Sequence, residues 1–185
     1  MFFQMRGALA EDERAKLLER TRRGTVGRIK AGNAWASGVP FGYRYIPEPH
    51  GGRWDVDDDE AALVRRIFTM CVSGISTRGI ATQLTAERQP TPSERHHNHQ
   101  SYKVLPAGVW GQQTVRQMLS NTAYRGEAIW GKQQNVTKTT RRRRPEHEWV
   151  RLAVPPIIGA GLLVTAGTTI SCSADGSAVA AAAAG

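Results

Sequence analysis

The sequence predicts an α+β fold that is mostly helical, with a long N-terminal helix, a compact domain of helices and short strands, and an unstructured C-terminal tail. Three observations support this prediction. Residues 8–23 hold no Gly or Pro and are rich in strong helix formers. Residues 57–72 carry apolar side chains at helical spacing behind an acidic first turn. From residue 159 onward the chain is mostly Gly, Ala, Ser and Thr, which bury little apolar surface.

The first predicted helix, over residues 8–23, is exposed. Its acids lie early, at 11–13, and its bases late, at 20–23, as the helix dipole favours. Gly24 can end this helix, or the helix can continue for another turn. Residues 31–40 are small and polar, and we expect them to form an extended linker.

Two strands and a helix are expected next. Residues 41–46 and 53–56 have the aromatic composition of strands, and the PEPHGG between them suits a hairpin loop. The helix over 57–72 begins with Asp57 and Glu60, spaced as in a capping box.

A second pair of helices is predicted further along. Ser76 caps a helix over residues 77–86, and another helix over residues 112–121 buries Val115, Met118 and Leu119. Residues 126–131 are expected to form a strand behind them. This order is typical of a winged helix-turn-helix with a long connection.

The outward side of the 112–121 helix suits recognition of base edges, because Gln pairs with adenine and Arg with guanine. The predicted base-reading residues are Gln112, Gln113, Thr114, Arg116 and Gln117. The alternative is a plain helical domain with a solvated polar face, and this segment alone does not decide between the two.

The charge is basic at both ends of the chain. The formal net charge of +9 divides into +4 for residues 1–30, zero for 31–110 and +5 for 111–185. Such a charge favours a nucleic acid or an anionic membrane as the partner. No signal peptide opens the chain, and the apolar stretch 153–164 is too short and too rich in Pro and Gly to span a bilayer. We therefore expect a cytoplasmic protein without a membrane partner.

Two basic clusters are candidate phosphate contacts. Those at the end of the first helix, where the chain enters the linker, suit a backbone and minor-groove contact: Arg20, Arg22, Arg23, Arg28 and Lys30. The run KTTRRRR at 138–144 is interpreted as a phosphate contact or an unstructured basic loop. Solvated charge is the alternative for the first cluster, and a nuclear localisation signal ranks below both interpretations of the second.

We expect no metal site and no cofactor. His96, His97 and His99 share a polar loop, 93–108, but no Cys or paired carboxylate supports a metal there, so an exposed loop is favoured. Cys71 and Cys172 have no partner at zinc-ligand spacing.

Five stretches occur in the order typical of one family. They are AEDERAKLLERTRRG at 10–24, VPFGYR at 39–44, EAALVRRIF at 60–68, GISTRGIA at 74–81 and WGQQTVRQMLSNTAYRG at 110–126. The chain resembles, over residues 7–158, the large serine recombinases (serine integrases) of the resolvase–invertase superfamily. The first stretch is similar to the long helix that ends their catalytic domain, and the others to their "recombinase" DNA-binding domain.

The resemblance implies DNA recombination through a serine nucleophile and 5′-phosphoserine links, without a cofactor. It implies duplex DNA, an attachment-site half-site, as the partner, with a full-length recombinase or a second copy bound through the N-terminal helix. Glu13 and Arg14 match the family's supporting Glu–Arg pair. The resemblance adds Arg14, Tyr43, Arg44 and Arg125 to the predicted DNA-binding residues, and Tyr43 and Arg44 are expected to steady the start of the domain.

The sequence also departs from the family. It contains neither Y-x-R-x-S nor D-R-x-x-R, so no catalytic serine is transferred, and we expect a truncated recombinase, part of a mobile element, that is inactive alone. The Gly/Ala-rich tail suggests a frameshift. The expected parts are the long helix 1–30, the linker 31–40, the recombinase domain 41–137, a basic loop with the start of a following segment at 138–158, and the tail 159–185.

Three other interpretations stay open. A stand-alone helix-turn-helix regulator would have to dimerise through the first helix. An RNA-binding basic protein is less favoured, because the aromatic pattern of RNA-recognition motifs is missing. A frameshifted fragment without function is the third.

Overall fold

The structure is a computed structural model, and it describes residues 2–49, 51–95, 108–135, 140–159, 171–172 and 178–179, with side chains in the first helix from Glu13 onward. The chain forms two compact units. Unit 1 consists of Met1–Val39, Tyr45–Trp54 and Glu127–Val154, and unit 2 of Pro40–Arg44, Asp55–Gly126 and Pro155–Gly185. The mixture of helices and short strands confirms the predicted class.

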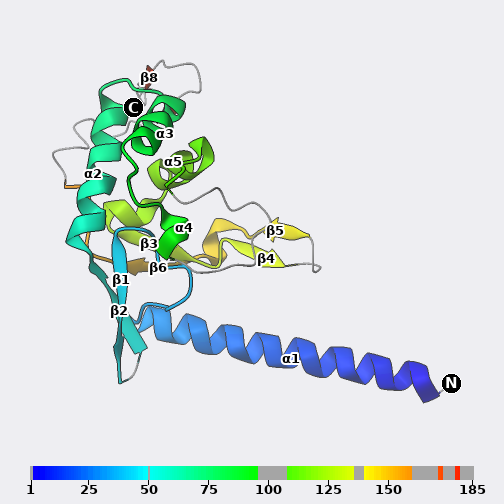
Figure 1. The fold of residues 1–185 in the computed structure, drawn as a ribbon. Coiled ribbons are helices and arrows are strands. Elements are labelled where there is room, and N and C mark those ends of the chain that lie inside the picture. Colours follow the sequence, from blue (N-terminus) through cyan, green and yellow to red (C-terminus); the bar gives the residue numbers. More distant parts are fainter. Residues whose placement is uncertain are drawn as a thin grey trace, which may run out of the picture. The chain divides into compact units, whose positions relative to one another are not determined.

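Unit 1 begins with one uninterrupted helix, α1 (Phe2–Lys30), which is longer at both ends than the predicted 8–23 (Figure 1). Gly24 does not end it. Leu17 and Leu18 lie on its surface with 64% and 65% of their area exposed, whereas Ile29 is buried. Neither α1 nor any other helix that the structure describes is both long and apolar enough to cross a membrane.

The two predicted strands form a two-stranded sheet, β1 (Tyr43–Glu48) with β2 (Gly51–Val56). Part of the segment expected to form an extended linker is bound to this sheet. Ala34 N donates to Gly52 O at 2.6 Å, and the buried Trp54 donates its indole N–H to Trp35 O at 2.9 Å. Ala34 and Trp35 are therefore held against β2, because two residues of β2 bind their backbone, whereas residues 36–38 are exposed.

Two further antiparallel pairs complete unit 1. The predicted strand near 126–131 is β3 (Glu127–Trp130), which pairs with β6 (Val150–Ala153), and α1 contacts β6. The basic run, for which an unstructured loop was one expectation, contains β5 (Arg141–Arg143), paired with β4 (Gln133–Asn135) (Figure 1). A 3₁₀ turn, Glu146–Glu148, follows β5. Residues 136–139 lie outside the described residues.

Unit 2 is built on three helices, α2 (Asp58–Val72), α3 (Thr77–Ala86) and α5 (Gln112–Leu119). Helix α3 packs against α5, and α2 contacts both (Figure 1). The centre of the unit is fully buried and apolar, because each helix turns one apolar stripe inward. Its least exposed aliphatic residues are Ala61, Val64, Ile67, Ile80, Leu84 and Val115, each at 0%.

Three short elements flank these helices. A turn of helix, α4 (Pro92–Arg95), begins where only a polar loop was expected, and the 3₁₀ helix η1 (Thr122–Arg125) follows α5. The three histidines at 96–99 lie outside the described residues. Within the predicted unstructured tail, β7 (Ser171–Cys172) pairs with β8 (Ala178–Val179); the rest of the tail beyond residue 159 lies outside the described residues.

Both predicted N-caps are confirmed, but the capping box predicted for Asp57 and Glu60 is not. Asp57 and Ser76 accept the backbone N–H groups of Glu60 and Gly79, respectively. The Glu60 carboxylate does not turn back to Asp57, because it accepts the backbone N–H of Gly42 at 2.7 Å. This bond fixes the start of β1 to the start of α2.

Candidate nucleic-acid interface

Helix α5 presents a polar row to solvent. Gln113, Arg116 and Gln117 are exposed, whereas Val115 and Met118 are buried against the rest of unit 2. Arg116 makes no ion pair with any residue that the structure describes. A guanidinium and two amides on one face offer donors and acceptors for base edges.

Two of the predicted base-reading residues differ from the rest. Gln112 is exposed, but its Nε2 donates to Thr77 Oγ1 at 3.2 Å, which ties the start of α5 to the start of α3. Thr114 is half-buried. Leu119, expected in the core, is also half-buried. The row available to a ligand is therefore Gln113, Arg116 and Gln117.

The basic end of α1 is exposed with one exception. Of the predicted DNA-binding residues on α1, the exposed ones are Arg14, Arg20, Arg23, Arg28 and Lys30. Arg23 is 3.5 Å from Glu19, an exposed pair that stabilises little. The exception is Arg22, which is half-buried and donates to Glu148 Oε2 at 3.4 Å. Glu13 is exposed on the same helix.

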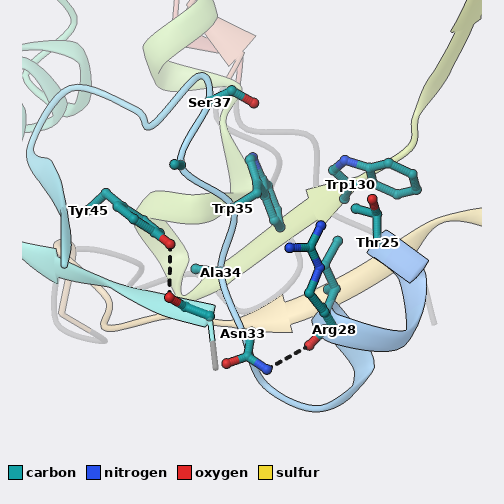
Figure 2. A pocket seen from close by; sticks show the side chains of 11 residues that line it. Thr25, Arg28, Asn33, Ala34, Trp35, Ser37, Tyr45 and Trp130 are labelled. Carbon is teal, nitrogen blue, oxygen red and sulfur yellow. Dashed lines mark hydrogen bonds between the residues drawn. The ribbon is translucent and has the colours of Figure 1, made fainter. Parts of the chain in front are cut away.

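A pocket of about 440 Å³ lies at the end of α1 within unit 1. It is bounded by α1, by residues 33–37, by Tyr45 and Gly51 of the hairpin and by Trp130 of β3. The side chains of Arg28, Trp35 and Trp130 all line the pocket (Figure 2). Sequence reasoning missed this pocket; the only signal for it was a Trp within a stretch of small residues.

The pocket wall is held by local hydrogen bonds. Asn33 Nδ2 donates to Arg28 O at 3.3 Å, and the Tyr45 hydroxyl donates to Gly51 O at 3.1 Å (Figure 2). Arg28 is the predicted phosphate-contacting residue that shares this pocket with two tryptophan side chains.

Tyr43 is not on the surface, which corrects its assignment to the DNA-binding residues. Its side chain has 0% exposure, and its hydroxyl lies 2.7 Å from both Ala123 O and Pro155 O. Burial raises the pKa of this hydroxyl far above its ordinary value. A buried ring that joins three segments of unit 2 supports the expected structural role instead.

The remaining two predicted residues are exposed. Arg44 Nη2 lies 3.2 Å from Asp55 Oδ2, so its charge is partly balanced. Arg125 ends the 3₁₀ helix η1 and has no acidic partner among the residues that the structure describes. The same described residues hold no cluster of three potential metal ligands.

The sequence is similar to proteins of a known family. Residues 58–162 match the family model described as Recombinase. Over 174 residues the chain is 30% identical to a "Putative DNA recombinase" of Bacillus subtilis (strain 168), covering 86% of this chain and 32% of that relative. The chain thus spans about a third of the length of that relative.

Two solved structures are similar at lower identity. One, described as "Sequence Requirements of the Listeria innocua prophage attP site", has 19% identity and a TM-score of 0.45, covering 78% of this chain and 48% of that one. The other, "Crystal Structure of a LSR-DNA Complex", has 18% identity and a TM-score of 0.42, covering 78% and 35%. Because the family model matches more than half of the sequence, the resemblance drawn from its motifs is confirmed, and the chain belongs to the Recombinase family.

Proposed function

We propose that this chain binds duplex DNA in a sequence-selective manner as the DNA-recognising part of a site-specific serine recombinase. The observation that carries the proposal is the face of α5. Its apolar residues Val115 and Met118 root the helix in the core, while Gln113, Arg116 and Gln117 stay exposed. Helices α3 and α5 act as a helix-turn-helix in which α5 enters the major groove and Arg116 contacts guanine.

The end of α1 supplies backbone contacts in this proposal. Four exposed cations of the helix, Arg14, Arg20, Arg23 and Lys30, suit phosphates, which position a protein without specifying sequence. Arg28, which lines the same pocket as Trp35 and Trp130, contacts the minor groove where the chain leaves the helix. Arg22 is excluded from this set because Glu148 binds it.

Strand exchange is proposed for the recombinase as a whole, through a serine nucleophile. This chain contributes recognition of a half-site. Its partner protein is a recombinase protomer or a second copy, bound along α1, where Leu17 and Leu18 are exposed. A full complex would bring two half-sites together, as the symmetry of recombination requires.

The test is selection from a random duplex library, followed by affinity measurements at several salt concentrations. The four phosphate contacts from α1 predict a slope of log affinity against log salt of about −3.6, and each further phosphate contact makes it about 0.9 steeper. Arg116→Ala is expected to reduce the preference for the selected duplex by roughly 5- to 150-fold, since a bidentate guanine contact contributes about 1–3 kcal/mol of discrimination.

The matched control is Arg53→Ala, an exposed arginine already paired with Glu48 at 2.9 Å, which is expected to leave the preference unchanged. Binding that depends on salt but is indifferent to sequence in the wild-type chain would refute sequence-selective recognition and leave only backbone contact.

A further inference from the structure

The β4–β5 ribbon is anchored at its base by one indole ring. The guanidinium carbon of Arg143 lies 4.9 Å from the Trp149 ring centre, and Lys132 Nζ lies 5.6 Å from it. Trp149 donates its own N–H to Arg144 O at 3.0 Å, and Arg144 N donates to Lys132 O at 2.9 Å. Cation–π contact and hydrogen bonds therefore hold both strands to the same side chain.

Two of the four consecutive arginines have an acidic partner at this base, one in a part-buried pair and one in an exposed pair. Arg144 is 2.6 Å from Glu148 Oε2, and its side chain is 16% exposed. Arg143 lies 3.4 Å from Glu146 Oε1. Burial, and then the nearby charge of Arg143, lower the pKa of Lys132 at this base.

The other two arginines have no such partner. Arg141 and Arg142 are exposed and make no ion pair with any residue in the described ranges. They are neighbours in β5, opposite Asn135 and Gln134 of β4, so their side chains lie on opposite faces of the ribbon. One phosphate cannot bind both guanidinium groups.

We propose that the β4–β5 ribbon is a second, sequence-independent contact with duplex DNA, in which Arg141 and Arg142 each bind a different backbone phosphate. The inference rests on the proposed DNA binding and adds a surface that neither α5 nor α1 contains. The guanidinium fork matches phosphate oxygens in a bidentate geometry, and the anchored base positions the two forks in advance.

The experiment compares Arg141→Gln/Arg142→Gln with the wild-type chain on the same duplex at several salt concentrations. Loss of two phosphate contacts is expected to make the salt slope about 1.8 less steep and to weaken binding about 60-fold at 0.1 M salt, with no difference near 1 M. The ratio of affinities for selected and unrelated duplexes is expected to stay constant, since phosphates carry no sequence information.

The matched control is Arg151→Gln, an exposed strand arginine that is already paired with Glu127 at 2.7 Å. It is expected to keep the wild-type slope, and both variants are expected to keep the wild-type melting temperature. A double variant with the wild-type slope would overturn the ribbon contact while leaving the recognition by α5 intact. A wild-type chain that binds no duplex would overturn both.

Discussion

Replacing Tyr43 by Phe isolates the contribution of one hydroxyl to the fold. The phenol O–H lies 2.7 Å from two carbonyl oxygens, of Ala123 and Pro155, in a site with 0% exposure. Phe keeps the ring and its stacking on Tyr124, whose centre is 6.1 Å away. The substitution therefore leaves the part-buried Pro155 O without this donor, whereas Ala123 O still accepts the backbone N–H of Gly126 at 2.9 Å. A buried unsatisfied group costs about 1–3 kcal/mol, so we expect the free energy of unfolding to fall by about 2 kcal/mol.

Urea unfolding measures this loss directly. With a slope of about 2 kcal/mol per molar, the midpoint of Tyr43→Phe is expected about 1 M lower at unchanged slope, and the melting temperature about 4–8 °C lower. Tyr45→Phe is the matched control, because its hydroxyl donates to Gly51 O at 3.1 Å from a half-buried position. If both variants unfold at the wild-type midpoint, the hydroxyl does not join these segments and the structural role of Tyr43 is wrong.

Three further perturbations test other features. Gly42→Ala is expected to destabilise the chain by about 2–4 kcal/mol in urea unfolding, because φ is +92° and the new Cβ would lie 2.8 Å from Ile157 Cδ1; a wild-type midpoint would contradict this. Ser76→Ala removes a confirmed N-cap and is expected to lower the free energy of unfolding by about 1 kcal/mol, whereas Ser76→Asn retains it. The Arg144 guanidinium lowers the pKa of Glu148 below its ordinary 4.5, so the stability from this pair is complete above pH 4.5 and is lost as the pH falls through the lowered value. Melting curves of Glu148→Gln between pH 3 and 7 are expected to lack that acid-dependent loss, and an unchanged pH dependence would refute the assignment.

The predicted parts of the fold are those that local chemistry determines. The bounds of α3 follow from the cap Ser76 at its start and from Pro90 after its end, because proline cannot continue a helix. Both lie within a few residues of the helix. The polar row of α5 follows from helical spacing, which separates Val115 and Met118 from Arg116 and Gln117. Such signals need no information about distant segments.

The missed parts depend on residues far apart in the sequence. Glu60 binds Gly42 N instead of its own cap, and Arg22 binds Glu148, which is 126 residues away. The strands β4 and β5 are short and polar, so they lack the apolar alternation that predicts a strand, and Arg143 of β5 contacts Trp149, which lies outside both strands. The docking of Ala34 and Trp35 was also missed, because their partners lie in the hairpin, almost 20 residues further along the chain.

The way the chain is divided between its units limits how this fold can be exchanged between proteins. The chain passes from one unit to the other after residues 39, 44, 54, 126 and 154. A graft of residues 40–126, chosen to transfer the helices of unit 2, would therefore also carry residues 45–54, the piece of hairpin on which the segment after α1 docks. A recombinase that acquired new helices by such an exchange would also acquire a new hairpin for the segment after its long helix to bind. The hairpin and that segment would therefore have to be inherited together.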